Sequence, residues 1–220
     1  MLNLVVSFVM RLLFYRMPPA SFTEDEVHTF ERIYADAIFH EREIRYEGPY
    51  SKHRFCQYIA INKPVILHGS NDKEISEFET RRQTRYNGQY VEAVFGTKDG
   101  IWPLFYAVFD RSKLSGNFRN ACFKVKGNRR YYFFSLTPET IAADPWTDGM
   151  IYFLPRQSFD SPSNSLVSFD EWISTTPVAP IAKLEVTSQD FPLKDKVARH
   201  RQNEPIVVSW LLYKLRIKRK

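Results

Sequence analysis

The residues whose chemistry stands out first are His68 and Ser70, which follow the short apolar run Val65–Leu67. Such a run predicts a buried strand, and the stretch from His68 to Asp72 is polar and turn-forming, so we expect the strand to end there. Gly69 would let a ligand approach the backbone closely. Strand ends and the loops after them often carry binding groups. The plain alternative is a histidine that bonds a neighbouring carbonyl.

A second candidate group follows the strand predicted at Val91–Phe95, which Gly96–Gly100 closes. The ring of Phe95 could stack on a planar ligand, and the hydroxyl of Thr97 could donate a hydrogen bond. Packing of Phe95 in the core is the alternative.

Charged residues form two more candidate groups. Asp170 and Glu171 precede a proline-rich turn and the last predicted strand, and a carboxylate there could stabilise developing positive charge. Arg81 and Arg82 could bind phosphates. A solvated acidic pair and a solvated basic run are the corresponding alternatives.

Several familiar sites are absent from the sequence: it has no GxGxxG, Walker A, HExxH or GxSxG pattern. The five histidines are scattered, and Cys56 and Cys122 share no CxxC spacing, so we expect no metal. Two isolated cysteines indicate buried thiols in a reducing, cytoplasmic compartment, with a disulfide as an unsupported alternative.

The 220 residues suit one large domain, or a domain with an appendage. With 44% hydrophobic residues, 18 Phe and 12 Tyr, the chain can build a largely aromatic core. The net charge of +6 is compatible with a nucleic-acid or nucleotide partner without requiring one.

The two ends of the chain differ from the middle. The apolar N-terminus is too short to span a membrane, is interrupted by Arg11, and lacks the features of a secretory signal, so it is either an upstream start or a docking helix. Residues 206–220 are basic and lack acidic residues. They read as a frayed, solvated tail or as an electrostatic anchor for phosphate backbone or anionic lipid.

Helices are expected first and strands later. Thr23 and Glu26 form a capping-box pattern ahead of helical apolar spacing. The further elements expected are a helix at His53–Ile61, a buried helix at Ile101–Phe109, strands at Ala121–Val125 and Tyr131–Leu136 joined through Gly127-Asn128, and strands at Gly149–Pro155 and Ile181–Val186, the last. This order predicts an α+β fold, N-terminal helices followed by a mixed, mainly antiparallel β core, rather than a parallel βαβ sheet. We divide the chain into an apolar extension (1–20), a helical subdomain (21–62), a β core (63–192) and a basic tail (193–220).

The order of motifs resembles a known family. A strand ending in Leu67-His68-Gly69-Ser70 precedes one ending in Val94-Phe95-Gly96-Thr97, then a buried helix around Trp102–Val108, and Glu171 ahead of Pro177–Ile181. This resembles the ADP-ribosyltransferase fold, in the branch with a His–Tyr–Glu triad. That branch includes poly-ADP-ribosyl polymerases, diphtheria-type toxins, rifampicin-modifying transferases and, more distantly, RNA 2′-phosphotransferases. The resemblance covers Pro64 to Phe191.

The resemblance implies that NAD is a substrate and assigns roles to residues. His68 would bond the adenosine ribose, and Gly69 would let the nicotinamide amide reach the backbone. Phe95 would stack on nicotinamide, but it stands where the family has Tyr. Glu171 would stabilise the oxocarbenium-like ribose, with Asp170 and Glu185 as competitors. The remaining members of the implied NAD-binding set are Ser70, Thr97 and Arg82.

The function predicted on this basis is an NAD-dependent ADP-ribosyltransferase, toxin-like, that releases nicotinamide and modifies a nucleic-acid, protein or small-molecule acceptor. The basic charge favours nucleic acid. The alternatives are a non-catalytic nucleotide- or RNA-binding module on the same fold, an RNA 2′-phosphotransferase-like enzyme, and a structural or interaction domain. We expect no integral membrane association, with the basic C-terminal tail as a further contact surface.

Overall fold

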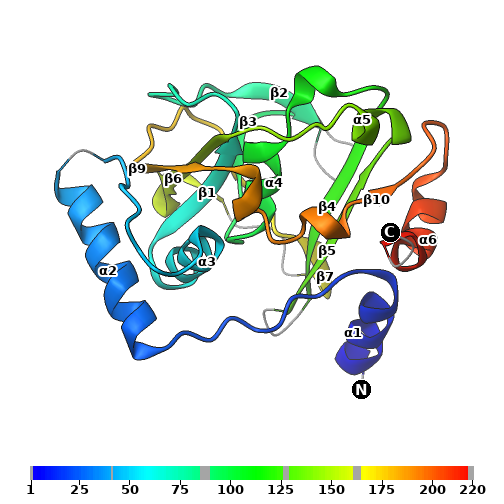
Figure 1. Cartoon of the computed structure of the whole chain (residues 1–220), viewed down its shortest axis with the longest axis horizontal. Helices are drawn as coiled ribbons and strands as arrows, with labels where there is room; N and C mark the ends of the chain where they lie inside the picture. The colour runs from blue at the N-terminus through cyan, green and yellow to red at the C-terminus, as the bar shows by residue number, and fades with distance from the viewer. Residues whose placement is uncertain (1, 41, 85–89, 126–128, 161–164, 218–220) are drawn as a thin grey trace.

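The computed structural model describes residues 2–40, 42–84, 90–125, 129–160 and 165–217 (Figure 1). In these residues six α-helices accompany ten strands in mainly antiparallel sheets, so the fold class is α+β, as predicted. The helices are α1 (Leu2–Leu13), α2 (Glu24–Phe39), α3 (Lys52–Asn62), α4 (Trp102–Val108), α5 (Pro138–Ala142) and α6 (Ile206–Ile217). The strands are β1 (Val65–Ser70), β2 (Arg81–Thr84), β3 (Tyr90–Gly96), β4 (Phe118–Val125), β5 (Arg129–Leu136), β6 (Gly149–Pro155), β7 (Val167–Phe169), β8 (Trp172–Ser174), β9 (Ala182–Val186) and β10 (Ala198–Arg199).

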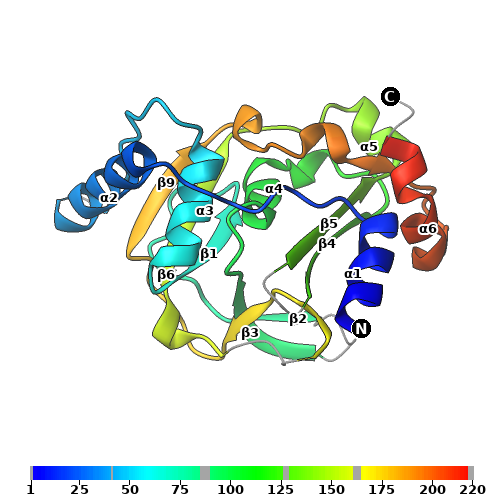
Figure 2. The same ribbon diagram turned by 90° about the horizontal axis from the view of Figure 1, so that it is seen from below.

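The strands form three sheets, in the orders β1-β6-β9, β10-β5-β4-β7 and β2-β3-β8. All pairs are antiparallel except β10 with β5. Helix α4 lies between the β1-β6-β9 sheet and the long β4–β5 pair (Figure 2). The helix is therefore at the centre of the molecule, and both larger sheets pack against it.

The predicted capping box at the start of α2 is confirmed. The Thr23 hydroxyl accepts the N–H of Glu26 at 3.2 Å, and the Glu26 carboxylate accepts the N–H of Thr23 at 2.9 Å. Arg54 of α3 also donates a hydrogen bond to Glu26. The hydrogen bonds from Arg54 and Thr23 lower the pKa of the Glu26 carboxyl to about 2. The motif therefore fixes the start of α2 and ties α2 to α3.

Helix α4 rests directly on the backbone of β1 and β6. A Cβ on Gly69 would lie 1.9 Å from the carbonyl oxygen of Pro103, and one on Gly149 would lie 1.8 Å from that of Ala107. No other residue type fits at either contact. The two glycines thus set how closely the helix approaches the sheet.

The long β4–β5 pair is buried on both faces, which explains its continuous aromatic run. On one face Cys122, Tyr132 and Phe134 join the central core with α3 and α4. On the other, Phe123 and Tyr131 pack against α1 and α6. Residues 206–217 therefore form a helix packed on a sheet, and the expectation of a frayed tail is wrong for them because Tyr213 is fully buried there.

Three sequence expectations about strands need correction. Strand β1 runs on through Ser70, because its pairing with β6 continues to Met150. Ile181–Val186 is not the last strand, since β10 follows it. Strands β2, β7 and β8 were not predicted. They are three or four residues long, too short to display a period. The predicted Gly127-Asn128 turn lies outside the described residues.

Both cysteines are buried and free, as expected of thiols without a partner spacing. Burial raises the pKa of each thiol. In the described part of the chain, no helix is long and apolar enough to cross a membrane.

Candidate functional site

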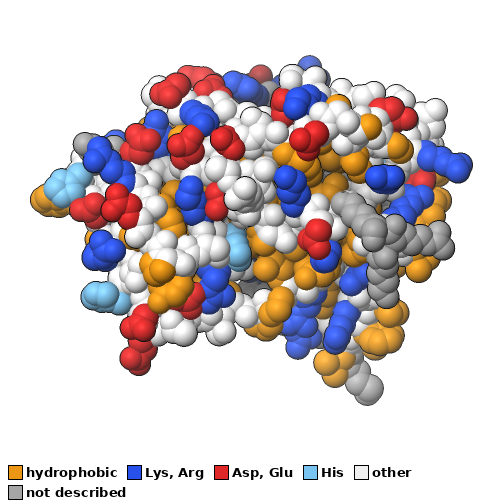
Figure 3. All heavy atoms as spheres, viewed as in Figure 1, with side chains coloured by type: hydrophobic (Ala, Val, Ile, Leu, Met, Phe, Trp, Pro, Cys, Tyr) orange, Lys and Arg blue, Asp and Glu red, His pale blue; other side chains and the backbone are white. Residues whose placement is uncertain are grey.

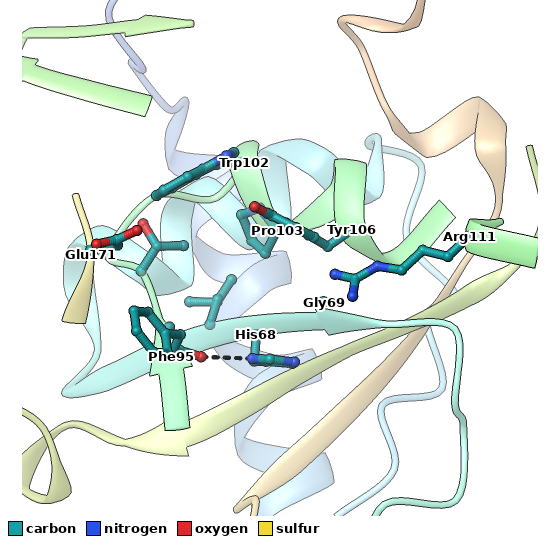
Figure 4. Close-up of a pocket in the computed structure, with 11 residues that line it drawn as sticks. His68, Gly69, Phe95, Trp102, Pro103, Tyr106, Arg111 and Glu171 are labelled. Atoms are coloured by element: carbon teal, nitrogen blue, oxygen red, sulfur yellow. Dashed lines mark hydrogen bonds between the residues drawn. The ribbon is translucent and has the colours of Figure 1, made fainter. Parts of the chain in front are cut away.

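A cavity of about 110 Å³ opens between the end of β1, the end of β3 and the helix α4 (Figure 4). Its lining combines one imidazole, one carboxylate, one guanidinium and three aromatic rings. The main contributors are His68, Gly69, Phe95, Thr97, Trp102, Tyr106, Arg111 and Glu171. Five residues singled out from the sequence, His68, Gly69, Phe95, Thr97 and Glu171, thus border one space.

Backbone pairing explains why these distant residues meet. Leu67 and Thr97 exchange two backbone hydrogen bonds, of 2.9 and 3.0 Å, which hold the end of β1 against the chain after β3. Strand β3 pairs with β8, with Gly96 opposite Trp172. Glu171, one residue before Trp172, therefore faces the same cavity as His68.

The imidazole of His68 is held in one orientation. Its Nδ1 lies 2.7 Å from the carbonyl oxygen of Phe95, so Nδ1 carries the proton and donates it to that carbonyl (Figure 4). The ring also packs on Phe78, at a centroid distance of 4.6 Å. Burial lowers the pKa of His68, so the imidazole is neutral at pH 7 and its Nε2 is a hydrogen-bond acceptor.

The aromatic wall opposite His68 comes from α4. Asn120 Oδ1 accepts hydrogen bonds from the Trp102 indole at 2.6 Å and the Tyr106 hydroxyl at 2.9 Å. One amide therefore fixes both rings with their faces available to the cavity. Burial raises the pKa of Tyr106, so its hydroxyl stays protonated.

The three carboxylates that the sequence offered as alternatives for one catalytic role have different surroundings. Asp170 is fully buried in an ion pair of 2.8 Å with Arg130. Glu185 is exposed on β9 and pairs with Lys73. Glu171 alone of the three lines the cavity, and its Oε2 is shielded from solvent.

A second, larger cavity of about 470 Å³ adjoins the first and shares part of its lining, including His68 and Arg111. Arg111 extends towards Gly69 (Figure 4) and lies over the rings of Tyr106 and Phe118, each at 5.6 Å. The two cavities are therefore neighbours, and Arg111 lies on their shared border.

The remaining predicted residues differ in position, and of these only Thr97 lines the first cavity. Ser70 lines the second cavity, and its hydroxyl accepts the N–H of Asp72 at 3.1 Å. The Thr97 hydroxyl accepts the N–H of Asp99 at 3.1 Å. Arg82 lines neither cavity among the described contacts; its guanidinium lies 4.7 Å from the Tyr90 ring, and Arg81 lines the second cavity instead.

Sequence reasoning missed Trp102, Tyr106 and Arg111. The segment Ile101–Phe109 was read as a buried helix because it is apolar nearly all round. The available signal was that Trp102 and Tyr106 are spaced four residues apart, on one face, and each carries a polar group that must find a partner when buried.

In the described residues, no group of three or more His, Cys, Asp or Glu side chains could hold a metal ion. The fold and site define an α+β protein with an aromatic cleft that contains one histidine and one carboxylate. In three comparisons no family model, no curated protein and no solved structure matches the chain.

Proposed function

We propose that the protein is an NAD-dependent ADP-ribosyltransferase, with NAD bound across the two adjoining cavities. The observation that carries the proposal is that His68, Phe95 and Glu171, which span more than half of the β core, line one cavity. These residues carry the resemblance noted in the sequence, and the pairing of β1, β3 and β8 explains their convergence.

The cavity suits the nicotinamide half of NAD. A planar ring would lie among Phe95, Trp102 and Tyr106, with Glu171 at one edge. Aromatic walls of this kind bind flat heterocycles by stacking. The neutral imidazole of His68 would accept a hydrogen bond from a ribose hydroxyl through Nε2.

The diphosphate would lie near Arg111, where the two cavities meet. A guanidinium pairs with phosphate oxygens through two parallel hydrogen bonds. The second cavity, with four carboxylates at Asp72, Glu74, Glu77 and Glu79, would take the adenosine, whose hydroxyl and amino groups are donors.

The reaction would break the C–N bond between ribose C1′ and the pyridinium nitrogen. The bonding pair stays with nicotinamide, and positive charge develops on the ribose. The Glu171 carboxylate would stabilise that charge, more strongly in an apolar cleft than in water. A nucleophile on the acceptor then bonds to C1′ and releases its proton. A protein or nucleic-acid acceptor fits this chemistry.

The test is incubation of the protein with NAD and cell lysate, measuring nicotinamide release and transfer of adenylate-labelled ADP-ribose to the protein or nucleic-acid fraction. Glu171→Gln should slow release by roughly 10²–10³-fold, the cost of removing one preorganised electrostatic group. Glu185→Gln is the matched control, because its carboxylate is exposed and lines neither cavity. Equal release by the wild type and Glu171→Gln would refute the proposal, and NAD binding without release would indicate a binding module.

A further inference from the structure

Helices α1 and α6 carry a concentrated apolar surface that faces solvent. Of the 15 large apolar side chains that are exposed among the described residues, six lie on α1 and five on α6. The most regular are two stripes at i, i+4 spacing, each more than half exposed: Leu4, Phe8 and Leu12 on α1, and Val207, Leu211 and Leu215 on α6. We call these six residues the terminal apolar surface.

The two helices are side by side. Trp210 of α6 lies edge-on to Phe14, just after α1, at a centroid distance of 5.9 Å, and both helices are at the same end of the molecule (Figures 1 and 2). Space-filling shows hydrophobic side chains and basic side chains together over α1 (Figure 3). Contiguous apolar surface of this kind marks a binding site for a protein or a membrane.

Both helices are apolar on the outward as well as the inward face, unlike a helix that faces water. Ser7 of α1 is buried, and its hydroxyl accepts a hydrogen bond of 3.0 Å from Arg129. Ser209 of α6 is 1% exposed; its hydroxyl donates to Glu204 at 2.6 Å and lies 2.5 Å from a guanidinium nitrogen of Arg119. Polar groups are satisfied inside while aliphatic groups face outward, so the outward face is not built for water.

The charged residues on the two helices themselves are all basic. Neither helix contains Asp or Glu, whereas α1 carries Arg11 and α6 carries Lys214 and Arg216. The nearest acid in sequence, Glu204, is paired with Arg216 at 2.7 Å. In the sequence, three further basic residues, 218–220, follow α6.

These observations favour a lipid surface over a second copy of the chain. A second copy would bring the same basic residues against one another across the interface, which is unfavourable. The exposed side chains are mostly aliphatic, whereas the residues that dominate protein interfaces are Trp, Tyr and Arg. An anionic bilayer supplies both the apolar phase and the opposite charge.

We propose that α1 and α6 dock the protein on the surface of a bilayer that contains anionic lipid. The two stripes enter the boundary between headgroups and acyl chains, and the basic residues meet the headgroups. Both helices lie along the surface, consistent with their shortness relative to a spanning helix. This property goes beyond the proposed enzymatic function and does not depend on it.

Co-sedimentation with vesicles tests the proposal directly. We expect the full chain to bind vesicles of phosphatidylcholine with about one third phosphatidylserine, and to bind pure phosphatidylcholine and high-salt samples more weakly. Phe8→Glu and Leu211→Glu should each lower partitioning about tenfold or more, because each places a charge where an apolar group is buried in lipid. Phe39→Glu is the matched control. That phenylalanine is 83% exposed, but it lies at the end of α2, at the opposite end of the molecule (Figure 1).

Phe8 and Leu211 are exposed, so the variants should unfold at the same urea concentration as the wild type, which separates docking from folding. Vesicle binding unchanged in both variants would overturn the proposal. Sedimentation velocity without lipid adds a second criterion: a wild-type dimer that Phe8→Glu converts to a monomer would assign the surface to a second copy and overturn lipid docking.

Discussion

Two clusters of ionisable and aromatic side chains lie on either side of the chain at Asp170-Glu171, and they use similar residue types differently. In the ion network, Asp99 and Asp170 flank Arg130, at 3.3 and 2.8 Å. Tyr132 donates to Asp99 at 2.7 Å, and the Trp172 indole donates to Asp170 at 3.1 Å. Two carboxylates therefore share one guanidinium, and each also accepts a hydrogen bond from an aromatic side chain.

The second cluster is the cavity around His68, Phe95 and Glu171. It is lined mainly by aromatic rings, whereas the first cluster is built around one guanidinium. Adjacent residues of one chain point into the two clusters: Asp170 into the network and Glu171 into the cavity. The network anchors the backbone that presents Glu171. The difference shows that two adjacent carboxylates of one chain can lie in separate environments, one in an ion network and one in a cavity lined by aromatic rings.

The largest expected effect comes from breaking the network. Arg130→Met should lower the free energy of unfolding by about 3–5 kcal/mol, because it leaves Asp99 and Asp170 buried without their cation. Urea denaturation followed by circular dichroism measures it. Arg129→Met is the matched control, which loses the hydrogen bond to Ser7 and should cost about 1 kcal/mol. Equal losses in both variants would contradict the role of the network.

Exchanging the two neighbouring carboxylates for amides should separate stability from activity. Asp170→Asn should destabilise the fold by about 1–3 kcal/mol, since it removes the charge facing Arg130, with NAD turnover per folded molecule largely retained. Glu171→Gln should change stability by less than about 1 kcal/mol and lose turnover. Paired urea and nicotinamide-release measurements test this; a Glu171→Gln protein as unstable as Asp170→Asn would join both residues to one structural cluster.

NAD binding should depend on the aromatic ring of residue 95 more than on the hydroxyl that a tyrosine would add there. Phe95→Ala should weaken NAD binding about tenfold, because the stacking face is lost, a change on the scale of 1 kcal/mol or more. Phe95→Tyr should stay within about threefold of the wild type, since it keeps that face. Calorimetric titration with NAD distinguishes the two, and equal affinities for Phe95→Ala and the wild type would rule out stacking.

The smallest effect expected is a pH dependence carried by histidines outside the network. Burial lowers the pKa of His200 to about 4 and also lowers that of His68. Below about pH 6.5 the unfolded chain therefore binds protons that the folded chain does not, so stability falls as pH falls. His200 alone should remove about 1–2 kcal/mol between pH 6.5 and 5. Urea unfolding at both pH values measures this.

His200→Gln should flatten that slope, and Arg130→Met should leave it unchanged. In the folded state Asn117 Oδ1 lies 2.6 Å from His200 Nε2, which donates, while Nδ1 accepts from the Ser135 hydroxyl at 2.8 Å. Protonation of Nδ1 would reverse the second bond, so that Nδ1 donates to the Ser135 oxygen and the Ser135 hydroxyl turns to the Ala198 carbonyl at 3.3 Å. Because His68 also contributes, part of the slope should remain; a slope as steep as that of the wild type would contradict the role of His200.

Local patterns predicted the elements with strong periodicity or clear caps. The capping box at Thr23 and Glu26 and the strands at Val91–Phe95 and Gly149–Pro155 are confirmed because each depends on neighbouring residues. The different environments of Asp170 and Glu171 could not be predicted from the sequence. They depend on the direction in which each side chain points just before β8, and on Arg130, which is forty residues away.

Tertiary contacts also decided what the sequence left open. Gly69 was interpreted as an opening for a ligand, but the carbonyl of Pro103 fills the position of its missing side chain. For the basic C-terminal segment, the sequence allowed either a solvated tail or an electrostatic anchor. In the structure it is a helix that packs on β5 through the buried side chain of Tyr213. Neither contact has a local sequence signature.

The burial of the outer face of β4 and β5 under both ends of the chain has a consequence for biosynthesis. Tyr131 and Phe133 leave the ribosome well before Tyr213, which covers Phe133 at a ring distance of 5.1 Å. Until α6 emerges, α1 is the sole terminal cover of that aromatic face. Nascent chains that stall before α6 should therefore expose the aromatic face of this sheet, and they should bind chaperones or aggregate.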